Sequence, residues 1–203
     1  MNIVSDNNLD IDTIITSLEQ GSVIVYPTET SYGLGCDATN QVSVNRIFDI
    51  KKRDHKKALL VIAPNIEMMM DYVYWNETLD RIAHTYWPGP LTVVVKAKPD
   101  TNIAKGVLAE DNTIAFRITN HPFASALATK LAAPLVSTSA NITGKSTPYD
   151  ITSVKDMFEK EDVTPDIVID AGNLPHKIPS TIIRVVGDYV DVLRQGEIII
   201  EYI

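Results

Sequence analysis

The sequence has almost no cysteine and no long hydrophobic run. Cys36 is the one cysteine, which excludes an internal disulfide and fits a reducing compartment. No apolar stretch approaches the roughly 18 residues of a membrane span. Residues 1–12 carry acids and amides in place of a basic segment followed by an apolar one, so no signal peptide is expected. Together these absences predict a cytoplasmic protein without a membrane segment.

Positive charge is also scarce. The chain has 18 Lys and Arg residues against 26 Asp and Glu residues, a net charge of −8. This balance does not favour a broad basic surface for nucleic acid, although a local basic patch stays open. An anionic ligand must therefore meet a few placed cations. With 45% hydrophobic and 22% charged residues, the 203-residue chain is predicted to form one globular domain, residues 1–203.

Metal and nucleophile patterns are missing. His55, His84, His121 and His176 are scattered and share no ligand spacing with Cys36, so no protein metal site is predicted. Cys36 is interpreted as a small buried residue, since no paired base or helix start is evident beside it. No serine stands in a G-x-S-x-G elbow, which leaves triad hydrolysis without support.

Helical and strand patterns alternate along the chain. Asp10 and Asn40 stand as helix caps before apolar residues at helical spacing, and Gly21 stands where the first helix would end. Helices are predicted at 11–20, 41–51, within 65–86 in two pieces, at 122–132 and near 153–160. Strands are predicted at 23–26, 58–63, 91–96, 113–118, 135–136, 167–170, 181–186 and 189–193.

The sum is an α/β fold with an open, twisted, mixed sheet and helices packed on it. The last two strands are expected to pair antiparallel across Gly187 and Asp188. Residues 99–112 form a long unpatterned stretch, a candidate lid or insertion. Ile198–Ile200 is expected to be an edge strand or a contact with a partner chain.

The stretch from Tyr26 to Ala38 is rich in hydroxyls and contains a G-x-G-x-x-A pattern at Gly33. This matches the dinucleotide-binding fingerprint, but residues 27–32 separate the predicted strand from Gly33, where the fingerprint needs its first glycine in the strand-ending turn. We therefore favour glycines that serve turn geometry.

Cations stand at the ends of predicted elements. Lys51 and Arg53 end the second helix, where a solvated terminus is the plain alternative to a site. Arg117 and Arg194 each stand beside turn residues and are the better site candidates. Arg184 is expected to point outward to solvent.

Hydroxyl and amide groups gather at two strand ends. Ser137–Asn141 follows a predicted strand at the carboxyl edge where open α/β sheets bind ligands, and Pro179–Thr181 precedes another strand. Such groups donate to phosphate and carboxylate oxygens without carrying charge. Taken alone, each cluster is equally well explained as a polar turn.

Together these segments resemble the YrdC-type threonylcarbamoyl-AMP synthase family in its short, single-domain form. The matching pieces occur in family order between about Gly21 and Glu197: residues 26–35, 50–53, 87–92, 115–117, 137–141, 179–182 and 193–196. Two departures lie in the loop after Arg53, where Asp54 and Ala58 stand at positions that often hold proline in relatives.

The resemblance implies a large concave cleft and a reaction that joins L-threonine, bicarbonate/CO2 and ATP, with Mg2+, into threonylcarbamoyl-adenylate and pyrophosphate. The product feeds the t6A modification of adenosine 37 in tRNAs that read codons beginning with A, through a downstream t6A transferase machinery (TsaB/TsaD/TsaE-like). Direct tRNA contact is open, and the net charge gives it little support.

The resemblance also implies roles for individual residues. The catalytic set is Lys51, Arg53, Ser139 and Asn141. The threonine-binding set is Thr30, Tyr32, Arg117 and Ser180. The nucleotide-binding set is Lys51, Arg53, Thr113, Ser137, Ser139, Asn141, Thr147 and Arg194.

Two other classes stay open from the residues alone. One is an RNA-binding module, against which the net charge of −8 argues. The other is a carbamoyl-adenylate-handling domain like those of hydrogenase maturation factors, which carry zinc-finger and acylphosphatase segments that the sequence does not show.

Overall fold

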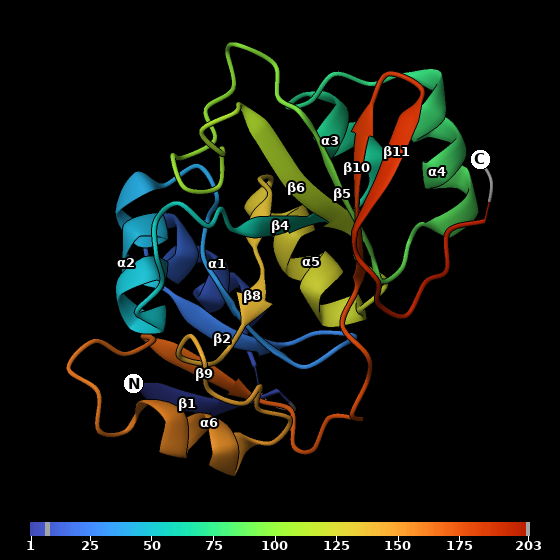
Figure 1. The fold of residues 1–203 in the computed structure, drawn as a ribbon. Coiled ribbons are helices and arrows are strands. Elements are labelled where there is room, and N and C mark those ends of the chain that lie inside the picture. Colours follow the sequence, from blue (N-terminus) through green and yellow to red (C-terminus); the bar gives the residue numbers. More distant parts are fainter. Residues whose placement is uncertain (7–8, 202–203) are drawn as a thin grey trace.

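The fold was obtained as a computed structural model that describes residues 1–6 and 9–201. It is a mixed α/β fold, as expected, but its strands divide between two sheets (Figure 1). The first sheet has the order β1-β9-β2-β3-β8 and the second has the order β11-β10-β5-β6-β4-β7. Two short strands that follow one another, β7 and β8, thus belong to different sheets.

In the first sheet the pairs β1–β9 and β9–β2 are parallel, whereas β2–β3 and β3–β8 are antiparallel. Its strands are β1 (Asn2–Ser5), β2 (Ile24–Pro27), β3 (Tyr32–Gly35), β8 (Thr138–Ser139) and β9 (Ile167–Asp170).

In the second sheet β10–β5 and β4–β6 are parallel, and the other pairs are antiparallel. Its strands are β4 (Leu60–Ala63), β5 (Leu91–Lys96), β6 (Thr113–Ile118), β7 (Leu135–Val136), β10 (Thr181–Val186) and β11 (Tyr189–Arg194). The antiparallel pairing predicted across Gly187 and Asp188 is confirmed.

Among the described residues six α-helices accompany the sheets: α1 (Ile11–Glu19), α2 (Gln41–Lys51), α3 (Ile66–Met70), α4 (Glu77–Tyr86), α5 (Pro122–Leu131) and α6 (Ile151–Phe158). The predicted caps are confirmed, since the Asp10 and Asn40 side chains accept from backbone N–H groups in the first turns of α1 and α2. Helix α5 packs against α1, against β2 of the first sheet and against β4 of the second (Figure 1). It therefore joins the two sheets through an apolar core.

An ion pair outside that core ties α2 to the first sheet. The Asp166 carboxylate accepts hydrogen bonds from Nη1 and Nη2 of Arg46 at 2.7 and 2.9 Å and from the Val23 backbone N–H at 2.7 Å. Burial alone raises the pKa of the Asp166 carboxyl, but these donors outweigh burial and the pKa is lowered. The pair holds α2 against the strand that leads to the hydroxyl-rich stretch.

Three expectations need revision. Strand β1 lies in the N-terminal segment, where no element was predicted. Residues 198–200 form no strand; Ile198 and Ile200 pack against the main core instead. The 99–112 stretch is anchored, because Ile103, Ala104 and Val107 are buried in that core.

Gly33 and Gly35 lie in β3, so the prediction that they serve a turn is wrong. Neither has a positive φ. A Cβ on Gly35 would lie 2.4 Å from the Val136 carbonyl oxygen and 2.7 Å from Cε1 of Tyr26. The glycines are needed because neighbouring backbone and an aromatic ring pass too close for any side chain.

We predict that Gly35→Ala destabilises the protein by about 3 kcal/mol, because overpacking against a backbone carbonyl cannot be relieved by a rotamer change. Chemical denaturation measures the loss. The control is Gly144→Ala, where nothing lies within 4 Å and only a φ of +85° opposes a side chain; it should lose about 1 kcal/mol. Equal losses in the two variants would contradict the close-approach explanation.

Candidate active site

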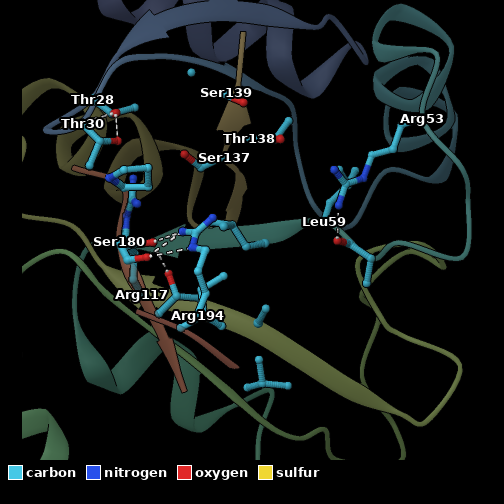
Figure 2. A pocket seen from close by; sticks show the side chains of 18 of the residues that line it. Thr28, Thr30, Arg53, Leu59, Arg117, Ser137, Thr138, Ser139, Ser180 and Arg194 are labelled. Atoms are coloured by element: carbon cyan, nitrogen blue, oxygen red, sulfur yellow. Dashed lines mark hydrogen bonds between the residues drawn. The ribbon is translucent and has the colours of Figure 1, made fainter. Parts of the chain in front are cut away.

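A cavity of about 710 Å³ opens between the two sheets and is lined by residues of both. Most of the side chains predicted for a site converge on it, although they are far apart in the sequence (Figure 2). Those that line it are Thr30, Arg53, Thr113, Arg117, Ser137, Ser139, Thr147, Ser180 and Arg194.

Strand alternation decides which side chains of the second sheet face the cavity. Thr92 and Val94 of β5, and Thr113, Ala115 and Arg117 of β6, all line it. In each strand these are every second residue, as expected for one face of a sheet. The floor of the cavity is therefore apolar in its middle and polar at its ends.

Tyr32 does not line the cavity, whereas its neighbours Ser31 and Gly33 do. Because side chains alternate along β3, Tyr32 points to the opposite face. There its hydroxyl donates to the Gly172 carbonyl at 2.8 Å and accepts from the Ala171 N–H at 3.0 Å. The alternation thus separates Tyr32 from the other residues predicted to hold threonine.

Lys51 and Asn141 lie behind the cavity wall. The Lys51 ammonium donates to the backbone carbonyl of Ser139 and, at 2.8 Å, to that of Asn141. The Asn141 amide in turn accepts from the Ser139 hydroxyl and donates to the Lys145 carbonyl at 2.6 Å. Lys51 therefore acts on the cavity through the segment that carries Ser139.

Burial lowers the pKa of Lys51 to about 7, with a smaller contribution from the positive charge of Arg53. Side-chain donors and acceptors from α2 and the 139–145 segment thus form one buried network. It fixes the direction in which the Ser139 hydroxyl reaches the cavity.

Arg53 enters the cavity from the C-terminal side of α2 (Figure 2). Its Nε donates to the Lys57 carbonyl at 2.8 Å and its Nη2 to the Ala58 carbonyl at 3.1 Å. Asp54, one of the two departures from the pattern that the resemblance implies, accepts the Lys56 N–H at 3.0 Å and so closes a turn with its side chain. Both departures from the family pattern are therefore accommodated, since the loop still bends back onto Arg53.

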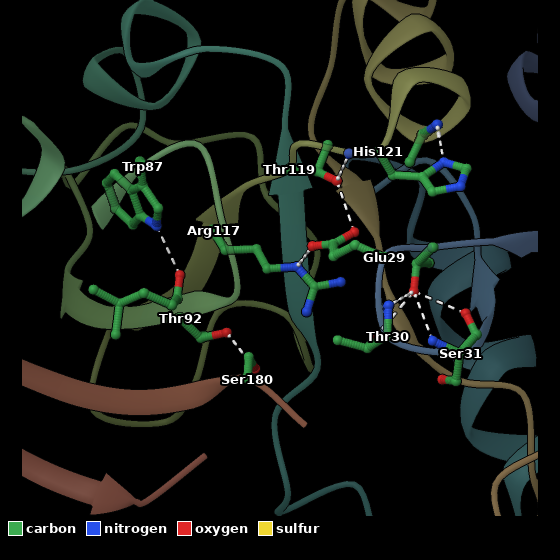
Figure 3. Close-up of polar contacts among 12 residues, drawn as sticks. Glu29, Thr30, Ser31, Trp87, Thr92, Arg117, Thr119, His121 and Ser180 are labelled. Carbon is green, nitrogen blue, oxygen red and sulfur yellow. Dashed lines mark hydrogen bonds and ion pairs between the residues drawn. The ribbon is translucent and has the colours of Figure 1, made fainter. Parts of the chain in front are cut away.

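Arg117 lies at the other end of the cavity, buried beside Glu29. Its Nε is 2.9 Å from Glu29 Oε1, and the two side chains are 5% and 7% exposed (Figure 3). The Thr119 hydroxyl donates to Glu29 Oε2 at 2.9 Å. Glu29 was not predicted as a site residue, because its partner stands far along the chain and no local pattern joins them.

Arg194 reaches the same end. Its Nη2 and Nε donate to the Ser180 carbonyl at 2.6 and 3.2 Å (Figure 2). Burial, and then the charge of Arg117, lower the pKa of Arg194. The Ser180 hydroxyl also lies 3.0 Å from that of Thr92, a lining residue that was missed although it ends the matched 87–92 segment. The guanidinium groups of Arg117 and Arg194 thus share one end of the cavity with the hydroxyl groups of Thr92 and Ser180.

Other lining residues were not predicted, among them Lys56, Tyr149 and Lys177. Arg184 is exposed, as expected, but it also lines the cavity rim and lies 3.5 Å from Asp111. Asp111 belongs to the 99–112 stretch, which therefore contributes to the rim.

The described part of the chain, residues 1–6 and 9–201, holds no group of three or more His, Cys, Asp or Glu side chains placed to bind a metal ion. Within the same residues no helix has both the length and the apolar character to cross a membrane. Cys36 is buried, which confirms its interpretation, and burial raises the pKa of its thiol to about 12.

The chain resembles known proteins in sequence and in fold. Residues 16–196 match the family model Sua5_yciO_yrdC, described as "Telomere recombination". A threonylcarbamoyl-AMP synthase of Pseudoalteromonas translucida (strain TAC 125) is 41% identical over 154 residues, which cover 74% of this chain and 81% of that protein.

Two solved structures share the fold. The crystal structure of P. abyssi Sua5 complexed with L-threonine is 27% identical to this chain with a TM-score of 0.83. The match covers 96% of this chain and 57% of the Sua5 chain. The crystal structure of E. coli YciO is 27% identical to this chain with a TM-score of 0.82, and the match covers 96% of this chain and 94% of the YciO chain. This chain thus spans little more than half of the Sua5 chain and nearly all of YciO.

We predict that Lys51→Met weakens ATP binding at least tenfold, because the Ser139 and Asn141 carbonyls lose their buried donor and the segment that carries them loosens. Calorimetric titration measures the affinity, and amide hydrogen exchange over residues 139–145 should become faster. The control is Lys52→Met; Lys52 is mostly exposed and pairs with Glu161. Slow exchange together with wild-type affinity in Lys51→Met would contradict the inference that Lys51 holds the segment carrying Ser139 in place.

Proposed function

The chain belongs to the Sua5/YciO/YrdC family, and we propose that it binds L-threonine, bicarbonate and ATP side by side in the cavity between its two sheets. It is an enzyme that forms threonylcarbamoyl-AMP and releases pyrophosphate, a nucleotidyl transfer. The product serves the t6A modification of tRNA.

One observation carries the proposal for this cavity: cationic groups stand at both of its ends with hydroxyl groups between them. Arg53 lies at one end and Arg117 and Arg194 at the other, with Ser137 and Ser139 along the wall (Figure 2). The carboxylate of threonine and the phosphates of ATP need two such places, and placed cations meet their charges in a protein whose net charge is −8.

We assign the end with Arg117 to threonine. A guanidinium group binds a carboxylate through two parallel N–H donors. The hydroxyls of Thr30 and Ser180 line the same cavity and can bond the ammonium or hydroxyl groups of the amino acid.

We assign the end with Arg53 to the nucleotide. Arg53 neutralises phosphate charge, and Ser137 and Thr147 donate to phosphate or ribose oxygens. The Ser139 hydroxyl gives its proton to Asn141 and can accept from a ribose hydroxyl. We also assign Thr113 to the nucleotide, together with Arg194, which lies at the threonine end and faces the reacting phosphate from there. Lys51 and Asn141 act from behind the wall by holding Ser139.

The lining residues include no acid–base pair matched to a proton transfer, which favours a reaction driven by placement and charge. The threonine ammonium first loses a proton to solvent. The free amine then adds to CO2 and loses a second proton to solvent, or condenses with bicarbonate and loses water, to give a carbamate. A carbamate oxygen then attacks the α-phosphorus of ATP in line, a new O–P bond forms, and the bond to the leaving pyrophosphate breaks. Arg53 and Arg194 stabilise the charge that builds up on the phosphate oxygens.

Mg2+ accompanies ATP in this proposal. Glu110 and Asp111 are the carboxylates that line the cavity in the described part of the chain. This donor set fits an ion held chiefly by the phosphates, as Mg2+ usually is. The ion supplies further charge neutralisation when it is bound.

We further propose that residues 1–203 form one domain, that the enzyme works in the cytoplasm, and that a t6A transferase machinery of the TsaB/TsaD/TsaE type takes up its product. Direct contact with tRNA is not part of the proposal, because the net charge gives it no support.

Incubation with ATP, bicarbonate and a panel of amino acids tests the proposal. Pyrophosphate release should depend on L-threonine and on bicarbonate, and a labile adenylate should appear in step with it. Release that is independent of every amino acid would overturn the assignment.

We predict that Arg53→Ala lowers threonine-dependent pyrophosphate release at least a hundredfold, because one aimed charge contributes about 3 kcal/mol or more to such a transition state. The unfolding midpoint should change little, since the Arg53 side chain bonds only to carbonyls of its own loop. The control is Arg81→Ala on α4, away from the cavity lining. Wild-type turnover in Arg53→Ala would contradict the nucleotide assignment.

A further inference from the structure

Glu29 stands in the connection between β2 and β3, where its neighbours line the cavity and it does not. Thr28, Thr30 and Ser31 all belong to the lining. The Glu29 carboxylate is instead turned behind them, 7% exposed, with Oε1 2.9 Å from Nε of Arg117. It therefore has no direct route to a ligand and acts only through Arg117.

The other oxygen of Glu29 is held as well. Oε2 accepts from the Thr119 hydroxyl at 2.9 Å, and that hydroxyl accepts the His121 backbone N–H at 3.2 Å (Figure 3). Thr119 and His121 stand between β6 and α5, so the chain of contacts begins in fixed backbone. If the carboxylate turned away from Arg117, the Thr119 hydroxyl would lose its acceptor and the buried guanidinium group would lose its counter-charge.

This arrangement leaves the two terminal nitrogens of Arg117, Nη1 and Nη2, without a partner among the described residues. Within residues 1–6 and 9–201 neither Nη1 nor Nη2 of Arg117 has a hydrogen bond or an ion pair, and the contact of Nε with Glu29 Oε1 is an ion pair without the alignment of a hydrogen bond. Figure 3 shows the two nitrogens pointing away from Glu29, toward the side on which Thr30 lies. A guanidinium group held at Nε presents its two terminal amino groups in the geometry that suits a carboxylate.

The pair also spans the two sheets. Glu29 follows β2 of the first sheet, and Arg117 belongs to β6 of the second. The contact therefore sets the distance between the hydroxyl-rich loop and the second sheet at the threonine end. An unpaired Arg117 in this place would be a buried charge without compensation and would turn toward other acceptors.

We propose that Glu29 is the positioning residue for threonine recognition: with Thr119 behind it, Glu29 orients Arg117 so that both terminal amino groups meet the α-carboxylate. The inference rests on the function proposed above and adds to it a residue that does not touch the substrate. It makes selectivity for a carboxylate-bearing amine depend on a side chain outside the cavity lining.

The test compares Glu29→Gln with wild type for L-threonine and for L-threoninol, in which a hydroxymethyl group replaces the carboxylate. We expect the threonine KM to rise at least tenfold in Glu29→Gln, while the ATP KM stays within twofold and kcat at saturating threonine stays within threefold. The preference for threonine over threoninol, as a ratio of kcat/KM values, should fall at least tenfold. A merely structural role would weaken both amines and ATP alike.

A matched control removes another acid that pairs with arginine. Asp166→Asn breaks the pair with Arg46, which lies outside the cavity lining. It should lose stability but keep the threonine KM and the threonine preference within twofold. The same result for Glu29→Gln would overturn the proposal.

Thr119→Val covers the case in which Glu29→Gln does not fold. It keeps both charges but removes the donor that holds Glu29 Oε2, so the threonine KM should rise about threefold to tenfold with an unchanged ATP KM. Unchanged KM and preference in this variant would overturn the proposal. Failure of the proposed function itself shows separately, as wild-type enzyme that releases no pyrophosphate with threonine.

Discussion

A buried ammonium group fixes the segment in which the two sheets meet. Residues 135–139 leave the second sheet at β7 and enter the first at β8, so their path sets one wall of the cavity. Lys51 holds the end of this path by donating to the Ser139 carbonyl and to the Asn141 carbonyl just beyond it. Because a buried amino group and the carbonyls that it bonds must keep one another as partners, the wall cannot move away from Lys51 without leaving buried polar groups unsatisfied. The end of α2, the sheet crossing and the Ser139 hydroxyl therefore move as one unit.

Local patterns predicted the elements with strong periodicity and missed those that depend on distant partners. The caps at Asp10 and Asn40, and the strands 91–96 and 113–118, were found because each is written in a few neighbouring residues. Strand β3 was missed because Gly33 and Gly35 carry no apolar signal; only the approach of Tyr26 and Val136 explains them. The division into two sheets follows from pairings between residues that are distant along the chain.

The candidate site shows the same difference between features that local patterns predict and features that depend on distant partners. Most of the site residues that the family resemblance predicted do line the cavity, but a motif does not say which face of a strand a residue occupies. Tyr32 stands inside a matched segment and still points away from the cavity, since alternation gives that face to Ser31 and Gly33. Glu29 stands in the same segment and is defined by Arg117, a partner 88 positions later. Orientation and long-range pairing are tertiary information that spacing does not carry.

Few cations are enough for this cavity because the protein directs each of them in advance. Arg53 and Arg194 donate Nε to the Lys57 and Ser180 carbonyls, and Nε of Arg117 forms an ion pair with the Glu29 carboxylate. A guanidinium group fixed at Nε loses its freedom to rotate during folding and not during the reaction. Its remaining donors then meet developing charge without reorganisation, which is where electrostatic stabilisation is largest. An acidic chain can thus gather positive charge in one cavity by orienting three arginines, and each of them is oriented by an acceptor of the protein itself.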